Sequence, residues 1–153
     1  SNGEEYGTHF ADGAYQRIEL SENGLNCRIV PASDPVGEGT YSAAEFMPAL
    51  IRDGEKLENQ DWTGEQPRAC FGAGDQGICM LVIEGRYPDE GIRGTSVNTC
   101  ADILLAYGCR NAINMDGGSS AILWYDGESV TQSSSVTLRY TGGRPLPNAW
   151  VYG

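Results

Sequence analysis

The sequence has few basic side chains and no long apolar run. Among its 153 residues, Lys56 is the single lysine and His9 the single histidine, and the net charge is −11. Nucleic-acid phosphates bind to basic surfaces, so a chain this acidic is not expected to bind nucleic acid. The longest apolar run, "ICMLVI", is only as long as a strand, whereas a membrane helix needs roughly 20 apolar residues. We therefore expect neither a nucleic-acid partner nor a membrane span.

The same scarcity excludes several catalytic arrangements. A P-loop needs a lysine that Lys56 does not supply, and a Ser-His-Asp triad needs a histidine, whereas His9 lies in a weakly patterned beginning. The stretch around Asp116 has neither the Asp-x-Asp of phosphoaspartyl phosphatases nor the G-x-S-x-G of a nucleophile elbow. The five cysteines form no C-x-x-C, which argues against a zinc site. We expect no metal and no cofactor.

Two of the cysteines flank a predicted hairpin turn at residues 74–77, in "RACFGAGDQGICMLVIEG". If the turn is centred between Gly74 and Asp75, Cys70 and Cys79 face each other across the hairpin. Opposed Cβ atoms there lie about 4.5–5.5 Å apart, so a disulfide requires a pair that is not hydrogen-bonded. A disulfide and two buried free thiols are both open at this point.

Glycine is abundant, at 21 residues, and predicts a β-rich chain with many tight turns. The clearest helix is "TSVNTCADILLAYG", with an N-cap at Thr95 or Ser96 and a stop at Gly108. A polar loop, "TQSSS", is expected to be solvated and without function. The fold class is α+β or α/β, with a β-rich mixed sheet, few helices and a single domain over residues 1–153. Strands are expected at residues 15–20, 25–30, 46–57 with a turn at Asp53-Gly54, 68–86 as a hairpin, 111–115, 121–130 as a second hairpin, 135–140 and 148–153.

The stretch "AINMDGGSSAILWYDG" is the strongest candidate for a site. It places Asp116 at the carboxyl end of a strand, where ligand sites of open α/β sheets lie. Gly117 and Gly118 let a backbone approach a ligand, and Ser119 and Ser120 add hydroxyl donors that can bind an anion. Asp116 can serve as nucleophile, general base or hydrogen-bond partner of a sugar. The alternative is a tight connection in which Asp116 forms an Asx-turn.

Three arginines, Arg68, Arg86 and Arg144, stand where loops meet strand-like runs. A planar guanidinium binds phosphate oxygens in a bidentate manner, although a surface ion pair is the commoner role of any one arginine. Residues 1–65 hold 13 acidic and 4 basic side chains, whereas residues 66–153 hold 8 and 6. An anionic ligand is therefore least repelled by the later part of the chain.

Taken together, these residues resemble the phosphodiester glycosidase family. The family's motifs appear in order over residues 46–153, as "FMPALIRDGE", "PRACFG", "EGR", "GIRGTSVNTCADILLAYG", "INMDGGSS" and "RPLPNAWVYG". Ordered motifs are more specific than one glycine-rich loop. Position 84 is glutamate where the family usually has aspartate, and the family's Asn-x-x-Phe-Phe segment is not found in residues 1–45. The chain is therefore expected to be a divergent member or the later part of such a domain.

The resemblance implies a glycosidase that hydrolyses a sugar-1-phosphodiester, such as a GlcNAc-1-phosphodiester, at a secreted or cell-surface location. It implies Asp116 as the catalytic carboxylate, with Glu84 next, and a small-molecule or glycan phosphodiester as the substrate. The phosphate would be bound by Arg68, Arg86, Arg144 and residues Gly117, Gly118, Ser119 and Ser120. Two other hypotheses stay open: a non-catalytic glycan- or phosphate-binding module, and a structural β-rich domain. The oligomeric state is not predicted.

Overall fold

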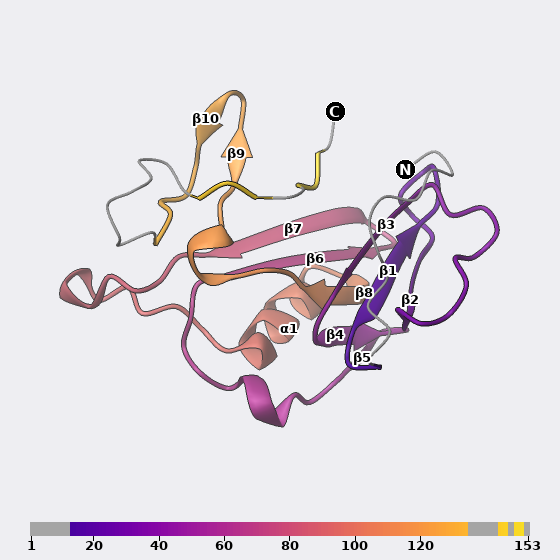
Figure 1. The fold of residues 1–153 in the computed structure, drawn as a ribbon, viewed down its shortest axis with the longest axis horizontal. Helices are drawn as coiled ribbons and strands as arrows, with labels where there is room; N and C mark the ends of the chain where they lie inside the picture. Colours follow the sequence, from indigo (N-terminus) through magenta and orange to yellow (C-terminus); the bar gives the residue numbers. More distant parts are fainter. Residues whose placement is uncertain (1–12, 135–143, 147–148, 152–153) are drawn as a thin grey trace.

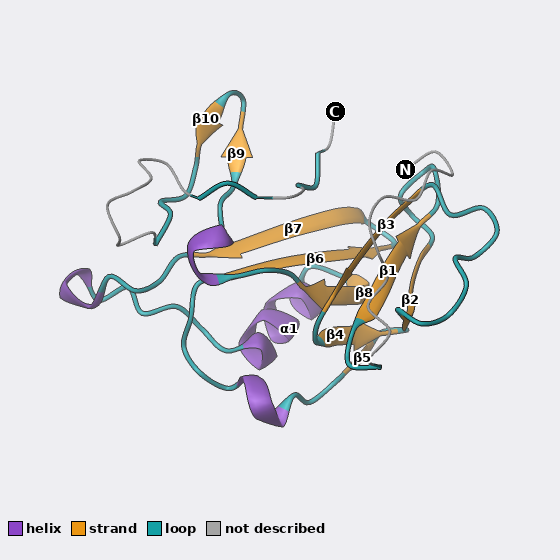
Figure 2. Ribbon diagram, in the orientation of Figure 1, coloured by secondary structure: helices purple, strands orange, loops and turns teal. Residues whose placement is uncertain are grey.

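The computed structural model describes residues 13–134, 144–146 and 149–151. A five-stranded sheet of order β5-β4-β8-β6-β7 forms the middle layer, with α1 on one face and the smaller sheet β2-β1-β3 on the other (Figures 1 and 2). All strand pairs among the described residues are antiparallel, so the expected β-rich fold with few helices is confirmed as α+β. None of the described helices is long and apolar enough to cross a membrane.

The elements have the following bounds: β1 Gln16–Leu20, β2 Cys27–Pro31, β3 Ser42–Phe46, β4 Ala49–Arg52, β5 Glu55–Lys56, η1 Gln60–Trp62, β6 Arg68–Gly74, β7 Gly77–Ile83, η2 Pro88–Glu90, α1 Val97–Ala106, β8 Cys109–Asn114, η3 Gly118–Ser120, β9 Trp124–Tyr125 and β10 Glu128–Ser129.

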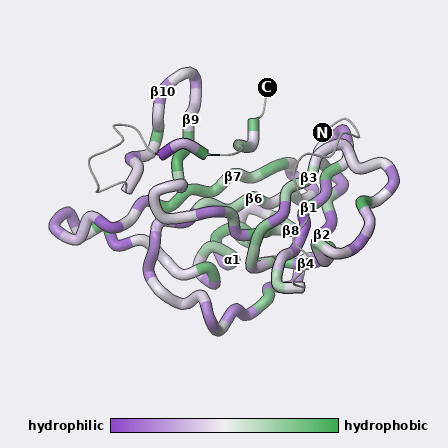
Figure 3. The backbone as a smooth tube through the Cα atoms, viewed as in Figure 1, coloured by the Kyte–Doolittle hydropathy of each residue, from purple (hydrophilic) through white to green (hydrophobic). Residues whose placement is uncertain are grey.

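Alternation along β6 and β8 divides the core into two clusters. Cys70 and Ala112 point toward α1 and pack with its buried face, whereas Phe71 and Ile113 point toward the small sheet. Successive residues of a strand face opposite sides of a sheet, so a strand that is covered on both faces carries apolar side chains on both of them. Figure 3 shows this as an apolar tube through β6, β7, β8 and α1, beside hydrophilic loops.

Helix α1 begins where the sequence predicts. Ser96 is the N-cap, and its hydroxyl accepts a 3.1 Å hydrogen bond from the Thr99 amide. Gly108 follows the helix with φ = +80°, a left-handed conformation that ends a helix most easily at glycine. The face that carries Val97, Cys100 and Leu104 is fully buried against the sheet.

The β6–β7 hairpin differs from its expected register. Gly74 pairs with Gly77, so the turn residues are Asp75 and Gln76, and Cys70 lies opposite Leu81. The expected apposition of Cys70 and Cys79 is therefore wrong, because the turn is centred one residue later than assumed. All five cysteines are free thiols.

Two other expectations about strands need correction. Residues 42–46, "SAAEF", form β3 beside β1, a strand that the sequence did not indicate. The expected strand at 148–153 is not seen in its described part, residues 149–151, although Trp150 stacks on Phe71 with ring centroids 4.0 Å apart. The expected strand at 135–140 lies outside the described residues.

Candidate active site

Three strand ends meet at one edge of the middle sheet. Arg68, which begins β6, pairs with Ile83, the last residue of β7, and Cys70 pairs with Asn114, the last residue of β8. Beyond the strands, the Gly118 amide donates to the Pro67 carbonyl at 2.9 Å. This antiparallel arrangement brings the segments around Arg68, Glu84–Arg86 and Asp116–Ser120 to the same edge.

The two glycines after Asp116 are packed against the protein itself. A Cβ on Gly117 would lie 2.6 Å from the Pro67 carbonyl oxygen. Gly118 has φ = +57°, and a Cβ there would lie 3.1 Å from Nη1 of Arg86. We expected these positions to lack side chains so that a ligand could approach the backbone. The structure gives another reason, because the Pro67 backbone and the Arg86 side chain already occupy the space that a side chain would need.

Asp116, Ser120 and Arg144 form a connected polar cluster. The Ser120 hydroxyl donates to Oδ2 of Asp116 at 2.7 Å, and Nε of Arg144 donates to the Ser120 hydroxyl at 2.8 Å. Arg144 also forms an ion pair with Oδ2 of Asp116 through Nη2. Oδ1 of Asp116 accepts no hydrogen bond from the described residues. The carboxylate is about half exposed, so it is fixed in orientation and open to solvent.

Arg68 is a buried cation held by carbonyl groups. It is 6% exposed, and its Nε and Nη2 donate to the carbonyls of Thr95 and Gly64 at 3.1 and 2.8 Å. The ring of Trp62 lies 5.9 Å from its guanidinium carbon, within the range of a cation–π contact. Burial lowers the pKa of Arg68. No carboxylate of the described residues pairs with it, so its charge is not neutralised by these residues.

Arg86 lies close enough to Arg68 for the two charges to repel, and this repulsion contributes to the lower pKa of Arg68. Its Nε and Nη2 donate to Oε1 of Gln66 at 2.9 and 2.7 Å, so its guanidinium is bound by a neutral amide. Its backbone has φ = +67°, which is uncommon for a residue with a side chain and costs on the order of 1–3 kcal/mol. Strain of this kind is concentrated at functional sites.

The partner of Glu84 differs from the partners of Asp116. Its Oε1 accepts a 2.5 Å hydrogen bond from the Gln132 amide. The expectation that the "TQSSS" loop is only solvated is therefore wrong in its described part. Ser133 donates to the Ser119 carbonyl at 3.1 Å, and Ser134 is buried. The loop therefore makes two hydrogen bonds to segments of the candidate site, one to Glu84 and one to Ser119.

Two neighbours of the site, Gln66 and Tyr87, were not predicted from the sequence. Gln66 orients Arg86, and Tyr87 donates its hydroxyl to the Ser133 carbonyl. Burial raises the pKa of Tyr87, and Glu84 and Glu90 add to this effect. Tyr87 directly follows the "EGR" motif, and this position could have indicated it. The sequence does not show, however, which group a single loop tyrosine binds.

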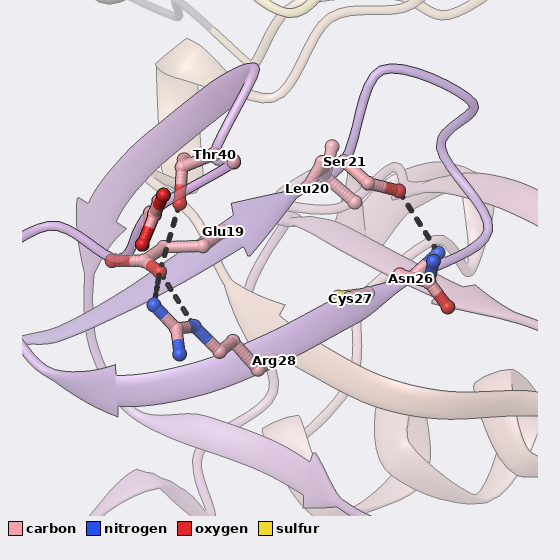
Figure 4. A pocket seen from close by; sticks show the side chains of 9 residues that line it. Glu19, Leu20, Ser21, Asn26, Cys27, Arg28 and Thr40 are labelled. Atoms are coloured by element: carbon pink, nitrogen blue, oxygen red, sulfur yellow. Dashed lines mark hydrogen bonds and ion pairs between the residues drawn. The ribbon is translucent and has the colours of Figure 1, made fainter.

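A concave region lies at the small sheet, away from these residues. A pocket of about 210 Å³ is formed at the small sheet, and its lining includes Glu19, Arg28 and Thr40 (Figure 4). The Arg28 guanidinium donates to Glu19 at 2.7 Å, and the Thr40 hydroxyl donates to the same carboxylate at 3.1 Å. Because these polar groups bind each other, the pocket is explained by an internal charge network.

Comparisons with known proteins agree with the fold. The family profile described as phosphodiester glycosidase matches residues 2–152. The catalytic domain of zebrafish N-acetylglucosamine-1-phosphodiester alpha-N-acetylglucosaminidase, solved in a form auto-inhibited by its pro-peptide, is similar with a TM-score of 0.55 and 16% identity. That match covers 78% of this chain and 45% of the zebrafish chain.

A hypothetical protein from Synechocystis is 19% identical with a TM-score of 0.48, over 80% of this chain and 32% of that one. A comparison with curated protein sequences gave no match. The chain thus spans less than half the length of either similar structure. The match of the family profile over nearly all of the sequence shows that the chain belongs to the phosphodiester glycosidase family.

Proposed function

We propose that this chain hydrolyses a sugar-1-phosphodiester, of which a GlcNAc-1-phosphodiester is the model, and releases the free sugar and a phosphomonoester. The observation that supports this best is that the segment after Asp116 lies against two arginines that have no carboxylate partner among the described residues. A Cβ on Gly117 would lie 3.7 Å from Cα of Arg68, and a Cβ on Gly118 would lie 3.1 Å from Nη1 of Arg86. The family supplies the reaction class. A secreted or cell-surface location is part of the same proposal.

The reaction suits a site rich in arginine. Cleavage at the anomeric carbon expels a phosphate monoester, whose last pKa is near 6 and which is therefore stable as an anion at neutral pH. An ordinary glycoside expels an alkoxide and needs a general acid to protonate it. In this proposal, Arg68 and Arg86 bind the phosphate, with the amides of Gly117 and Ser119 and the Arg144 side chain beside them, so the developing charge meets fixed cations. The amides of Gly118 and Ser120 already donate to the carbonyls of Pro67 and Gly117.

Asp116 acts on the sugar side of the bond. Ser120 and Arg144 hold Oδ2, and Oδ1, which accepts no hydrogen bond from the described residues, is the oxygen that would meet the substrate. A carboxylate in this position stabilises the oxocarbenium-like transition state or attacks it as a nucleophile. Glu84 stays the second candidate, although its bond to the Gln132 amide favours a role in holding the loop.

The proposal is tested by release of GlcNAc from a GlcNAc-1-phosphodiester, with the 153-residue chain assayed beside the full gene product. Asp116→Asn should lower kcat at least about a hundredfold, the usual scale of acid–base catalysis. Asp126→Asn is the matched control, because Asp126 lies in an exposed hairpin turn with φ = +49° that asparagine tolerates. Equal turnover in the two variants would remove Asp116 from the chemistry.

One observation favours a second function, a glycan- or phosphate-binding module without catalysis. Arg144 already neutralises the Asp116 carboxylate with an ion pair. Saturable binding of GlcNAc-1-phosphate by the full gene product, with no hydrolysis of the diester, would support this function instead.

A further inference from the structure

Four of the five cysteines lie in the core that α1 covers. Cys70 on β6, Cys100 on α1 and Cys109 at the start of β8 are buried in one cluster, and Cys79 on β7 packs against it. They form two neighbouring pairs, Cys70 with Cys100 and Cys79 with Cys109. The Cys70 thiol also donates to Oδ1 of Asn114 at 3.9 Å. Cys70 is 4% exposed and Cys100 is not exposed at all. Neither pair is used by the proposed reaction, so their contacts need a separate explanation.

The two pairs differ in how closely their backbones can approach. Strand β6 lies between β7 and β8, so Cys79 and Cys109 belong to strands two spacings apart, or about 9.5 Å. The Cα atoms of a disulfide lie no more than about 6.8 Å apart. The two thiols meet only because Gly72 between them has no side chain, and a Cβ there would lie 3.0 Å from Sγ of Cys109. This pair makes contact without the backbone approach that a bond requires.

Cys70 and Cys100 have no strand between them, since α1 packs directly on the face of β6 that carries Cys70. The segments that lead into β6 and α1 are also tied together. Gln66 and Thr95 exchange backbone hydrogen bonds of 3.1 and 3.0 Å, and Nε of Arg68 donates to the Thr95 carbonyl. These bonds hold the start of the strand and the start of the helix side by side, a few residues before each thiol.

We propose that Cys70 and Cys100 are a cross-linking site, joined by a disulfide when the protein meets a low-molecular-weight disulfide such as oxidised glutathione. One thiolate attacks the glutathione disulfide and releases one glutathione, and the second thiol then displaces the other glutathione. Two thiols lose two protons and two electrons, and the oxidant becomes two glutathione thiols. Because both sulfurs are buried, the exchange occurs during folding or local opening.

The bond would have a clear consequence for the candidate site. It would link α1 to β6 two residues after Arg68. The Thr95 carbonyl, which accepts a hydrogen bond from the Arg68 guanidinium, lies just before α1. It also closes a loop of about 30 residues, which restricts the unfolded chain. The oxidised protein should therefore melt on the order of 10 °C above the reduced protein. This inference does not depend on the proposed hydrolysis.

The experiment is a disulfide map of the wild-type chain, refolded with oxidised or with reduced glutathione. Free thiols are alkylated without reduction, the protein is digested, and the peptides are identified by mass spectrometry. The oxidised sample should contain one peptide pair, linked through Cys70 and Cys100, with the other three cysteines alkylated. Cys70→Ser and Cys100→Ala should each abolish both the linked pair and the shift in melting temperature, whereas Cys27→Ser keeps both.

Two results would overturn the proposal. One is alkylation of both Cys70 and Cys100 in the folded, oxidised wild-type chain, and the other is a linked pair between Cys79 and Cys109 in their place. The map of the wild type needs no variant, so a substitution that fails to fold does not weaken the test. Loss of hydrolysis with the linked pair intact would count against the proposed function and not against this cross-link.

Discussion

Single residues explain why the segment after Asp116 has no bulky side chain. Gly117 passes beneath the Pro67 carbonyl, and Gly118 combines a left-handed backbone with the Arg86 guanidinium above it. Both constraints concern the protein's own packing. The glycines therefore serve the site indirectly, because they allow the Asp116 segment and Arg86 to occupy the same small space.

Gly118→Ala tests this reading at the residue scale. A side chain at φ = +57° costs about 1–2 kcal/mol of stability, and the added methyl group also displaces Arg86, whose Nη1 would lie 3.1 Å away. Gly127→Ala is the control, since Gly127 has φ = +80° and open space around it. Denaturant unfolding should show similar losses for both variants, while binding of inorganic phosphate should weaken only in Gly118→Ala. Unchanged phosphate binding in both variants would separate Arg86 from the anion site.

The sequence predicted which residues gather at the site better than it predicted their partners. Ordered motifs placed Arg68, Arg86, Asp116 and Arg144 in one site, and the structure brings them to one edge of the sheet. The partner of Arg86, Gln66, was not predicted, because a single glutamine between a polar connection and Pro67 has no distinguishing pattern. Contacts between loops depend on tertiary structure that periodicity does not encode.

At the scale of elements, α1 connects the core to Arg68. The helix starts at the Ser96 cap, and the residue before the cap, Thr95, accepts the Arg68 hydrogen bond. Ser96→Ala should therefore destabilise the protein by about 1 kcal/mol and should also loosen Arg68. Thermal unfolding measures the first effect, and the affinity for inorganic phosphate measures the second. Ser33→Ala, in an exposed turn after β2, is the control and should change neither. A stability loss without any change in affinity would show that the cap does not position Arg68.

The elements that were missed share a physical cause. β3, "SAAEF", has small side chains and no β-branched residue, so its strand conformation comes from pairing with β1 and not from propensity. The shift of the β6–β7 turn has a similar origin, because Gly74, Asp75, Gln76 and Gly77 all suit a turn. Pairing with β8 and packing of Phe71 into the second core cluster are consistent with the observed register. The long helix and the central strands were predictable because their apolar periods are unambiguous.

At the scale of the whole molecule, the acidic first third of the chain is organised around buried charge. Glu19 is 2% exposed and accepts hydrogen bonds from Arg17 and Arg28 at 2.8 and 2.7 Å, and Arg17 is itself buried. Arg17 also donates to the carbonyls of Ala32, Asp34 and Pro35. The sequence indicated β1, β2 and the charge balance of this region, but it gave neither β3 nor the register that brings these charges together.

This network predicts how the molecule responds to acid. Burial alone would raise the pKa of Glu19, but the hydrogen bonds from Arg17, Arg28, Gly37 and Thr40 together hold it below its usual value of 4.5. A carboxyl group whose pKa is lower in the folded state stabilises the fold above the pKa of the unfolded chain. That stabilisation is lost as pH falls below about 4.5 toward the lower folded pKa, because the unfolded chain then binds the proton first.

Glu19→Gln should remove this acid sensitivity and leave the buried Arg17 with Glu45, at 3.4 Å, as its remaining counter-ion. Breaking a buried pair costs about 3–5 kcal/mol at neutral pH, whereas Glu58→Gln, which breaks an exposed pair with Lys56, should cost no more than about 1 kcal/mol. The measurement is the melting temperature of wild type and both variants between pH 7 and about pH 3. Wild type and Glu58→Gln should lose stability in parallel as the pH falls below about 4.5, while Glu19→Gln follows a flatter line from a lower start. Parallel curves for all three proteins would show that protonation of Glu19 does not cause the loss of stability at low pH.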